Sequence, residues 1–394
     1  MEKNFLPYGK QDINDEDIKS VNNVLKSDFL TQGTVHKEFE RAVSKKVESK
    51  YCVSFNSATS GLHIACLALK LGKGDILWTT PNTFVASANC AIYCGAQIDF
   101  VDIEAHTGLM SIELLEVKLR EASKVGKLPK IIIPVHLAGS SCDMPSIYNL
   151  SKEYGFRIIE DASHAIGGQC NDLKVGSCKY SDITVFSLHP VKIITSAEGG
   201  LATTNSESLY YLMRALSNHG IIKEKHRFLG NNYELWRYEK QSLVFNYRLS
   251  DVHAALGLSQ LKRLDLFVQK RNEIACTYKE KLANLPLKTL IPYSFVKSTY
   301  HLFIVQLQIV DKEFHEYIFN YLRSKGIGVQ LHYLPVHLQP FYLKMGFSEG
   351  RFPNSENFAI SSFSLPIFTS LSNDDITRVV DALSSALKVN KNKF

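Results

Sequence analysis

Apolar residues recur at two different spacings along the chain, and the changes of spacing outline its structural elements. Residues 15–26 carry apolar side chains such as Ile18 and Val24 on one helical face, and Asn14 precedes them. This pattern predicts an opening amphipathic helix. From Tyr51 onward, short apolar runs alternate with helical stretches. Such alternation is typical of a mainly parallel sheet that is covered by helices.

The alternating region predicts a large α/β domain at residues 1–261, followed by a smaller α+β domain at 262–394. The strands expected in the large domain are residues 51–55, 76–80, 97–101, 131–136, 157–161, 183–187 and 200–204. Its further helices are expected from Ser60, from Thr83, and at 144–154, 209–216 and 249–264. A loop is expected at 221–245, where the residues are charged and aromatic without periodicity. The elements expected in the small domain are helices at 265–285 and 374–389 and strands at 301–307 and 329–333.

The composition is that of an ordinary globular protein, with 45% hydrophobic residues, 21% charged residues and a net charge of +6. Basic and acidic residues are interleaved along most of the chain, so a nucleic acid is not an expected partner. The sequence shows neither a signal-peptide core nor a run of about 18 apolar residues. We therefore expect a cytoplasmic protein with no membrane partner. The 8 cysteines form no C-x-x-C pair and the 13 histidines are dispersed, so we expect free thiols and no metal site.

Lys192 stands in a loop of small residues between the predicted strands 183–187 and 200–204. A lysine amine attacks carbonyl groups efficiently only when desolvation or a nearby cation lowers its pKa. Taken alone, a lysine is more often a solvated surface charge. Together with the segments described next, its place in this loop favours a Schiff-base lysine of the kind that binds pyridoxal phosphate.

Other segments at the ends of predicted strands carry chemistry that suits a phosphorylated cofactor. The turn Asn56-Ser-Ala-Thr-Ser-Gly61 opens a helix and so favours an anion, although ordinary helix capping explains the same residues. Asp161 ends a buried strand, where its carboxylate can pair with a protonated ring nitrogen, and a helix cap is an equal alternative. Phe84 offers a ring for stacking, although aromatics at such positions are usually core. Ser187 and His189 add polar groups just before the loop lysine.

A series of longer motifs contains these residues in a fixed order. The motifs are Leu30-Thr-Gln-Gly33, Asn56-Ser-Ala-Thr59, Thr80-Pro-Asn-Thr-Phe-Val-Ala-Ser-Ala88, Glu160-Asp-Ala-Ser-His-Ala165, Phe186-Ser-Leu-His-Pro-Val-Lys192, Glu198-Gly-Gly200, Ser217-Asn-His-Gly220 and Asn246-Tyr-Arg-Leu-Ser-Asp251. Over nearly the whole chain, the set resembles the DegT/StrS-type pyridoxal phosphate-dependent sugar-nucleotide aminotransferases. The resemblance implies an aspartate-aminotransferase-like α/β fold of type I, with a large mostly parallel sheet, helices on both faces and a smaller carboxyl-terminal α+β domain.

The resemblance also implies roles for individual residues around pyridoxal 5'-phosphate. Lys192 is expected to bind the cofactor covalently and to act as the catalytic residue. Asp161 is expected to pair with the ring nitrogen, Phe84 to stack on the ring, and His164 to lie near the phenolic oxygen. The remaining residues expected at the cofactor hold its phosphate and are Ala58, Thr59, Ser187 and, from the neighbouring subunit of a homodimer with shared active sites, Asn246.

The implied reaction moves the amino group of L-glutamate to C4 of a UDP-linked 4-keto-6-deoxy-N-acetylhexosamine. The sequences around Lys192 and Asn246 are similar to those of the subgroup that serves pseudaminic acid biosynthesis. Ile193, Ser196 and residues 135–139 depart from that subgroup and leave the exact sugar open. The residues expected to meet the sugar nucleotide are Tyr8, Asp28, Phe29, Leu30, Thr31, Gln330, Leu331, His332 and Tyr333.

Several alternatives compete with this function. The acceptor can belong to another pathway, of the perosamine or bacillosamine type. A dehydratase of the same family would have a histidine in place of Lys192, so the lysine argues against it. A pyridoxal phosphate-binding regulator without turnover is a third alternative. The segment 223–238 is expected to contribute to the substrate site across the dimer, and a protein-docking surface is its alternative role.

Overall fold

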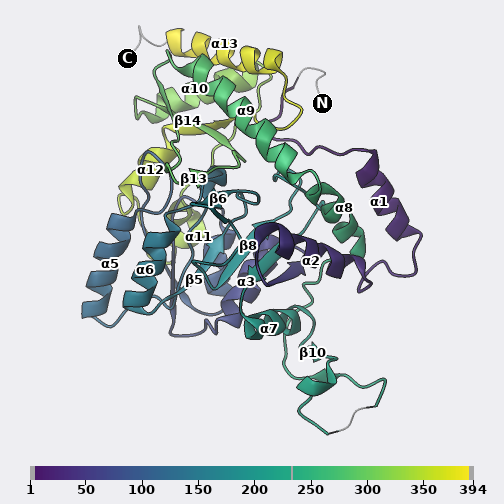
Figure 1. The fold of residues 1–394 in the computed structure, drawn as a ribbon. Helices are drawn as coiled ribbons and strands as arrows, with labels where there is room; N and C mark the ends of the chain where they lie inside the picture. Colours follow the sequence, from purple (N-terminus) through teal and green to yellow (C-terminus); the bar gives the residue numbers. More distant parts are fainter. Residues whose placement is uncertain (1–4, 232–233, 390–394) are drawn as a thin grey trace.

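The computed structural model describes residues 5–231 and 234–389, which form a large sheet-centred region and a smaller region at the carboxyl-terminal end (Figure 1). The central sheet has 7 strands in the order β1-β9-β8-β5-β4-β2-β3. These strands are β1 (Tyr51–Phe55), β9 (Gly200–Thr204), β8 (Ile183–Ser187), β5 (Arg157–Asp161), β4 (Ile131–Ile132), β2 (Ile76–Thr79) and β3 (Gln97–Phe100).

Neighbouring strands of this sheet pair in parallel, except that β9 runs antiparallel to both β1 and β8. The expectation of a large, mostly parallel sheet is therefore confirmed. The short antiparallel strand gives the lysine loop its shape, because β8 enters the loop and β9 leaves it. Gly200, the first residue of β9, lies between Phe55 of β1 and Ser187 of β8 in the strand register.

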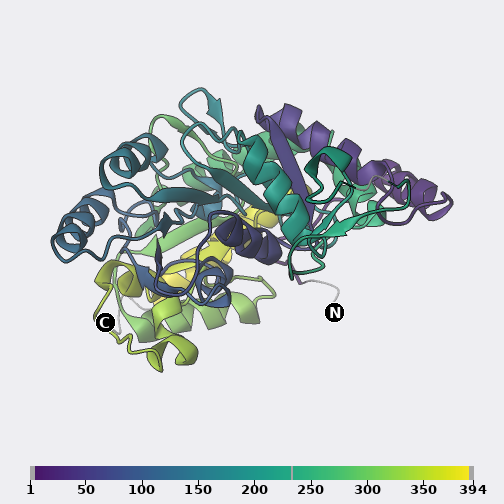
Figure 2. The same cartoon turned by 90° about the horizontal axis from the view of Figure 1, so that it is seen from below.

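Helices cover both faces of the sheet (Figures 1 and 2). They are α1 (Asp15–Leu25), α2 (Val35–Val47), α3 (Ala58–Ala68), α4 (Ala86–Tyr93), α5 (Ile112–Lys124), α6 (Met144–Tyr154), α7 (Glu207–Ser217), α8 (Asp251–Leu261), α9 (Leu264–Leu282), α10 (Lys312–Ser324), α11 (Pro340–Leu343), α12 (Pro353–Ala359) and α13 (Asn373–Val389). Short 3-10 turns occur at Leu137–Gly139, Lys225–Arg227 and Val336–Leu338.

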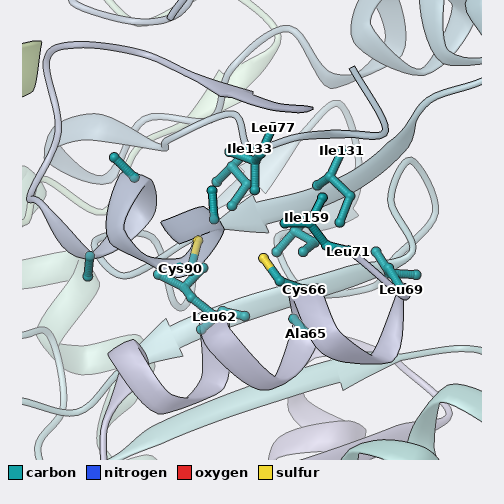
Figure 3. Close-up of a cluster of buried hydrophobic side chains, with 14 of the residues drawn as sticks. Leu62, Ala65, Cys66, Leu69, Leu71, Leu77, Cys90, Ile131, Ile133 and Ile159 are labelled. Carbon is teal, nitrogen blue, oxygen red and sulfur yellow. The ribbon is translucent and has the colours of Figure 1, made fainter. Parts of the chain in front are cut away.

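Successive strand residues point to opposite faces, which divides the core into layers. Leu77 and Ile131 pack towards α3 and α4, whereas their neighbours Trp78 and Ile132 pack towards α5 and α6. Burial on both faces explains why these strands are continuous apolar runs. Figure 3 shows side chains of α3 and α4 facing those of the sheet, namely Leu62, Ala65, Cys66 and Cys90 against Leu77, Ile131, Ile133 and Ile159.

The smaller region packs α9, α10 and α13 against a sheet of 3 strands. Its strands are β12 (Leu287–Thr289), β14 (Phe303–Leu307) and β15 (Ser362–Leu365). The shared core includes Tyr278 and Phe303 and reaches back to Leu6, so the amino terminus also contributes to it. The predicted boundary between residues 261 and 262 falls just before α9, and the division into domains stays a prediction.

The strand expected at 329–333 is wrong. Only Gln330 forms a bridge there, to Ser364, and the following residues leave the sheet. Val329 packs in the small-region core, whereas Gln330, His332 and Tyr333 line a cavity, so even and odd positions of this run do not divide between two faces as in a strand. The helix α2 was not predicted, although Phe39, Val43 and Val47 recur at a spacing of four and are buried.

The segment 221–245 projects from the body of the protein near α7 (Figure 1). Its described residues are mainly irregular, as expected, but they include the paired strands β10 (Ile221–Ile222) and β11 (Glu239–Lys240). A third small sheet joins β13 (Val296–Lys297), β6 (Gln169–Cys170) and β7 (Leu173–Lys174). In the part of the chain that the structure describes, no helix has the length and apolar character needed to cross a membrane.

Candidate active site

The carboxyl ends of β1, β5 and β8 lie at one edge of the sheet, where ligands of open α/β sheets bind. Segments that follow these strands surround a cavity of about 340 Å³. The walls are made by Tyr8, Ser57, Ala58, Thr59, Leu62, Thr83, Phe84, Ala86, Val135, Asp161, Ser163, His164, Ser187, His189, Val191, Lys192, Glu198, Gly199, His301, Gln330, His332 and Tyr333. The structure therefore brings together residues that are up to 325 positions apart in the sequence.

The first turn of α3 forms one wall of the cavity. Ser57 caps this helix by accepting a hydrogen bond from the Ser60 amide at 3.1 Å, and the first intrahelical bond is donated by Gly61. The amides of Ala58 and Thr59 precede that bond, so they remain available to an anion at the positive end of the helix dipole.

Gly200 lets β9 approach this turn closely. A Cβ atom at Gly200 would lie 2.4 Å from the carbonyl oxygen of Ser57 and 2.5 Å from the amide nitrogen of Ala58. Any residue with a side chain would therefore displace the backbone of the turn. The glycine is a steric requirement of this wall.

Asp161 ends β5 and is buried, with its carboxylate held on both oxygens. Ser87 of α4 donates a hydrogen bond to Oδ2 at 2.6 Å, and the amide of Ser163 donates one to Oδ1 at 3.1 Å. Thr83 in turn contacts the Ser87 hydroxyl at 2.9 Å. These bonds fix the orientation of a carboxylate that lines the cavity and can pair with a cationic ring nitrogen.

Lys192 lies half-buried in the loop between β8 and β9. Its backbone amide donates to the carbonyl of His189 at 2.9 Å, and Thr195 closes the loop with a bond from its hydroxyl to Leu188. Burial lowers the pKa of Lys192 to about 8, although the nearby Asp161 carboxylate opposes the shift. A fraction of the amine is therefore unprotonated close to neutral pH, as a nucleophile requires.

Three histidines, His164, His301 and His332, line the cavity. Burial and the charge of Lys192 hold the pKa of His164 well below its usual range and lower that of His332 to about 3. Burial is also the main reason that the pKa of His301 lies well below its usual range, and the nearby His164 and Lys192 lower it further. The rings of His164 and His301 lie 4.4 Å apart. All three are therefore neutral imidazoles at physiological pH.

Two hydrogen bonds from backbone amides tie the segment 333–336 to the loop after β2 beside the cavity. The amide of Tyr333 donates to Oδ1 of Asn82 at 3.0 Å, and the amide of Val336 donates to the carbonyl of Pro81 at 2.8 Å. Phe84 follows this contact and is 57% exposed, with its ring 6.3 Å from that of Tyr333. An aromatic with so much free surface at the mouth of a cavity is available for stacking on a ligand ring.

Many of the residues predicted from the sequence meet in this cavity, but a group of them does not. Asp28 to Thr31 lie in the exposed connection between α1 and α2, and Asn246 is exposed next to the projecting segment. Leu331 does not line the cavity either, although its neighbours on both sides do. The residues predicted at the site that do line the cavity are Tyr8, Ala58, Thr59, Phe84, Asp161, His164, Ser187, Lys192, Gln330, His332 and Tyr333.

Sequence reasoning missed His301, Ser87 and Gly200 as parts of the site. Ser87 and Gly200 stand inside motifs that were recognised, so a closer reading of those motifs offered a signal. His301 precedes the buried strand β14 without any local pattern, and only the folded chain places it beside His164. Among the described residues, no group of three His, Cys, Asp or Glu side chains is arranged to hold a metal ion.

The chemistry of these walls fits pyridoxal phosphate. The open amides at Ala58 and Thr59 suit its phosphate, the fixed Asp161 carboxylate suits its ring nitrogen, and the amine of Lys192 suits its aldehyde. The steric fit of Gly200 against the turn at residues 57–58 keeps that wall clear of side chains.

Comparisons with known proteins agree with this chemistry. Residues 11–384 match the DegT/DnrJ/EryC1/StrS aminotransferase family. The chain is 38% identical over 389 residues to the UDP-4-amino-4,6-dideoxy-N-acetyl-beta-L-altrosamine transaminase of Campylobacter jejuni, with 98% of each chain covered.

Solved structures are similar over almost the same length. PseC of Helicobacter pylori, an aminotransferase involved in the biosynthesis of pseudoaminic acid, has a TM-score of 0.88 at 30% identity, covering 98% of this chain and 100% of PseC. The putative sugar aminotransferase Spr1654 from Streptococcus pneumoniae, in its PLP form, has a TM-score of 0.88 at 28% identity, covering 98% of this chain and 99% of that one. Spr1654 has also been solved in a PMP form.

Proposed function

Because the chain belongs to the DegT/DnrJ/EryC1/StrS aminotransferase family, whose enzymes depend on pyridoxal phosphate, we propose that it transfers the amino group of L-glutamate to C4 of a UDP-linked 4-keto-6-deoxy-N-acetylhexosamine. The product would serve pseudaminic acid or a related surface glycan. The choice of sugar is supported by the 38% identity to the C. jejuni altrosamine transaminase. The reaction itself is supported by the meeting of Lys192, Asp161 and the α3 amides in one cavity.

The proposed cofactor residues would contact different parts of pyridoxal phosphate. Ala58, Thr59 and Ser187 would bind its phosphate, because they lie where β1 and β8 end on either side of Gly200. Asp161 would hold a proton on the ring nitrogen, and Phe84 would cover the ring from the cavity mouth. His164 would lie near the phenolic oxygen.

When bound, pyridoxal phosphate supplies an electron sink for the electrons left on a substrate carbon when its proton departs. The amine of Lys192 would remove and return that proton, since a lowered pKa of about 8 leaves part of it unprotonated near neutral pH. The same side chain belongs to a short loop and lines the cavity together with Asp161, so it would stay beside a cofactor bound there. Glutamate would donate the amine in the first half of the reaction, and the keto sugar would accept it in the second.

The sugar nucleotide would enter past Tyr8, Gln330, His332 and Tyr333, which line the cavity on the side of the small region. Asn246 and the turn at Asp28 to Thr31, which lie outside the cavity, would reach it from a second subunit of a homodimer. The exposed apolar side chains of the projecting segment support this association, because Leu235 is 92% exposed and Leu243 is 89% exposed.

The association is tested by sedimentation of the wild type and of Leu235→Asp and Leu243→Asp variants. A dimeric wild type that the two charges weaken would support it. A wild type that sediments as a monomer under assay conditions would contradict the shared site.

The function is tested by following the visible absorbance of the purified protein through two additions. L-Glutamate should convert the spectrum of the lysine-bound cofactor to that of pyridoxamine phosphate, and a UDP-4-keto-6-deoxy-N-acetylhexosamine should restore it. Lys192→Ala should lose both changes and keep its fold, whereas Lys281→Ala, an exposed lysine on α9, should match the wild type. Discharge by glutamate without recovery by the sugar would refute the proposed acceptor, and no discharge by glutamate would refute the proposed donor.

A further inference from the structure

The hydroxyl of Tyr333 is part of a short hydrogen-bond chain on the wall of the cavity. The backbone amide of Ala138 lies 3.3 Å from Nδ1 of His164, and Nε2 of the same ring lies 3.1 Å from the Tyr333 hydroxyl oxygen. The carbonyl of His164 accepts a bond from Thr299 at 2.8 Å, which fixes the backbone behind the ring. The direction of each bond in this chain can be assigned from its donors.

The amide of Ala138 is only a donor, so Nδ1 of His164 must accept and cannot carry a hydrogen. Burial and the charge of Lys192 hold the pKa of His164 well below its usual range, so the ring is neutral. A neutral imidazole without a hydrogen on Nδ1 has it on Nε2. His164 therefore donates to the oxygen of Tyr333.

A phenol that accepts a hydrogen bond on one side still has its own hydrogen to donate. Within the described residues, the Tyr333 hydroxyl has no hydrogen-bond partner other than His164. Its side chain lines the same cavity as Lys192 and Asp161. Burial and the charge of Asp161 raise the pKa of Tyr333, so the hydroxyl keeps its hydrogen at the pH at which Lys192 becomes a free amine.

We propose that Tyr333 is a catalytic residue that donates a hydrogen bond to the carbonyl oxygen of the amino acceptor, and that His164 is the positioning residue that aims this hydrogen. The proposal rests on the amino transfer proposed above. During that transfer the acceptor carbon forms a bond to the amine nitrogen and loses its oxygen as water. Both hydrogens of the water come from the amine, so Tyr333 polarises the carbonyl and keeps its own proton.

The segment that carries Tyr333 is held independently of His164. The backbone amide of Tyr333 is bonded to Asn82, which lies three residues after the end of β2. Tyr333 is therefore attached to the large region at its backbone, through Asn82, and at its hydroxyl, through His164. Rigid placement is what a donor needs if it is to favour the transition state over the ground state. The two carbonyl substrates are the keto sugar and, in the reverse of the glutamate half-reaction, 2-oxoglutarate. In each, the carbonyl oxygen is on the carbon that bonds to the amine nitrogen, so both reactions should depend on Tyr333.

The test uses single-turnover absorbance of the protein loaded with pyridoxamine phosphate and mixed with either carbonyl compound. Tyr333→Phe should slow the reaction with 2-oxoglutarate and with the UDP-4-keto sugar by a similar factor, about 100-fold, the loss typical of one oxyanion donor. Tyr293→Phe is the matched control, because its half-buried hydroxyl donates to Glu104 at 2.8 Å outside the cavity and should leave both rates unchanged. Slowing of the sugar reaction alone would overturn the proposal in favour of a sugar contact, and so would unchanged rates.

The role of His164 is tested by a mutant cycle. His164→Leu should slow both reactions, His164→Gln should restore part of the rate because its amide can donate, and His164→Leu should add little to Tyr333→Phe. Full additivity in the double variant would overturn the positioning role.

A separate readout does not depend on turnover. Nitrogen NMR of histidine-labelled protein should find the hydrogen of His164 on Nε2, and a hydrogen on Nδ1 would overturn the assignment. A wild type that reacts with 2-oxoglutarate but not with the sugar would refute the proposed acceptor and leave the Tyr333 test intact. A wild type inert to both would overturn both proposals.

Discussion

Replacing Gly200 by alanine should weaken the binding of pyridoxal phosphate and leave the binding of unphosphorylated pyridoxal almost unchanged. The added Cβ would lie 2.4 Å from the carbonyl oxygen of Ser57 and 2.5 Å from the amide nitrogen of Ala58, and both atoms belong to the backbone. Ordinary contact begins near 3.4 Å, so the turn must move by about 1 Å. A side-chain rotation cannot relieve this clash.

The displaced atoms belong to the turn that we propose binds the phosphate. A charge-assisted hydrogen bond contributes about 1.5–3 kcal/mol, and a shift of this size should cost about one such bond. The dissociation constant for pyridoxal phosphate should therefore rise by about 10- to 150-fold. The crowding should also lower the free energy of unfolding by about 1–3 kcal/mol.

The assay is a titration of cofactor-free protein with pyridoxal phosphate and, in parallel, with pyridoxal, followed by absorbance. Gly72→Ala is the control, because a Cβ at Gly72 would have no atom within 4 Å. Equal weakening of both ligands would show that the clash does not act through the phosphate. Unchanged binding of pyridoxal phosphate would refute the assignment of the turn at residues 57–59.

Three further predictions follow from the site and its surroundings. The rate at which cofactor-free protein captures pyridoxal phosphate should rise with pH and level off above about 8, because the unprotonated Lys192 is the nucleophile and burial lowers its pKa to about 8; a rate that still climbs between pH 9 and 10 would contradict this. Ser87→Ala removes the 2.6 Å bond to Asp161 and should lower kcat by about 10- to 150-fold with the fold intact, as one charge-assisted bond predicts, and kcat equal to wild type would contradict the role of that bond. Arg271→Met should lower the free energy of unfolding by about 3 kcal/mol in a urea titration, because the buried guanidinium is bonded to the carbonyls of Tyr300, His301 and Ile367. An unchanged midpoint of urea unfolding would show that those carbonyls find other donors.

The sequence predicted best those elements whose pattern is set by burial within the large sheet. The strands β1, β5, β8 and β9 and the helix α6 were predicted with the bounds that the structure shows. These strands are short apolar runs between turn residues, so their ends are marked locally. The helices α2, α5 and α10 were not predicted, although α2 carries a regular apolar spacing.

The site was predictable where one motif carries one function, and unpredictable where distant segments meet. Asp161 ends β5 and Lys192 lies in the loop that follows β8, and these parallel strands end at the same sheet edge. The bond between His164 and Tyr333 joins residues 169 positions apart, and no local pattern signals it. The strand expected at 329–333 was wrong for a related reason. Apolar residues alternate there in the sequence, but Tyr333 lines the cavity together with Gln330 and His332 while Val329 packs in the small-region core.

The register of β9 sets the spacing between the two halves of the site. Phe55, Gly200 and Ser187 lie in one row across β1, β9 and β8, so main-chain hydrogen bonds connect the turn after β1 to the strand that delivers Lys192. Main-chain hydrogen bonds of this kind require no particular side chains, apart from the absence of a side chain at Gly200. Core residues on either face of the sheet can therefore be exchanged without changing the distance between the first turn of α3 and the loop that carries Lys192.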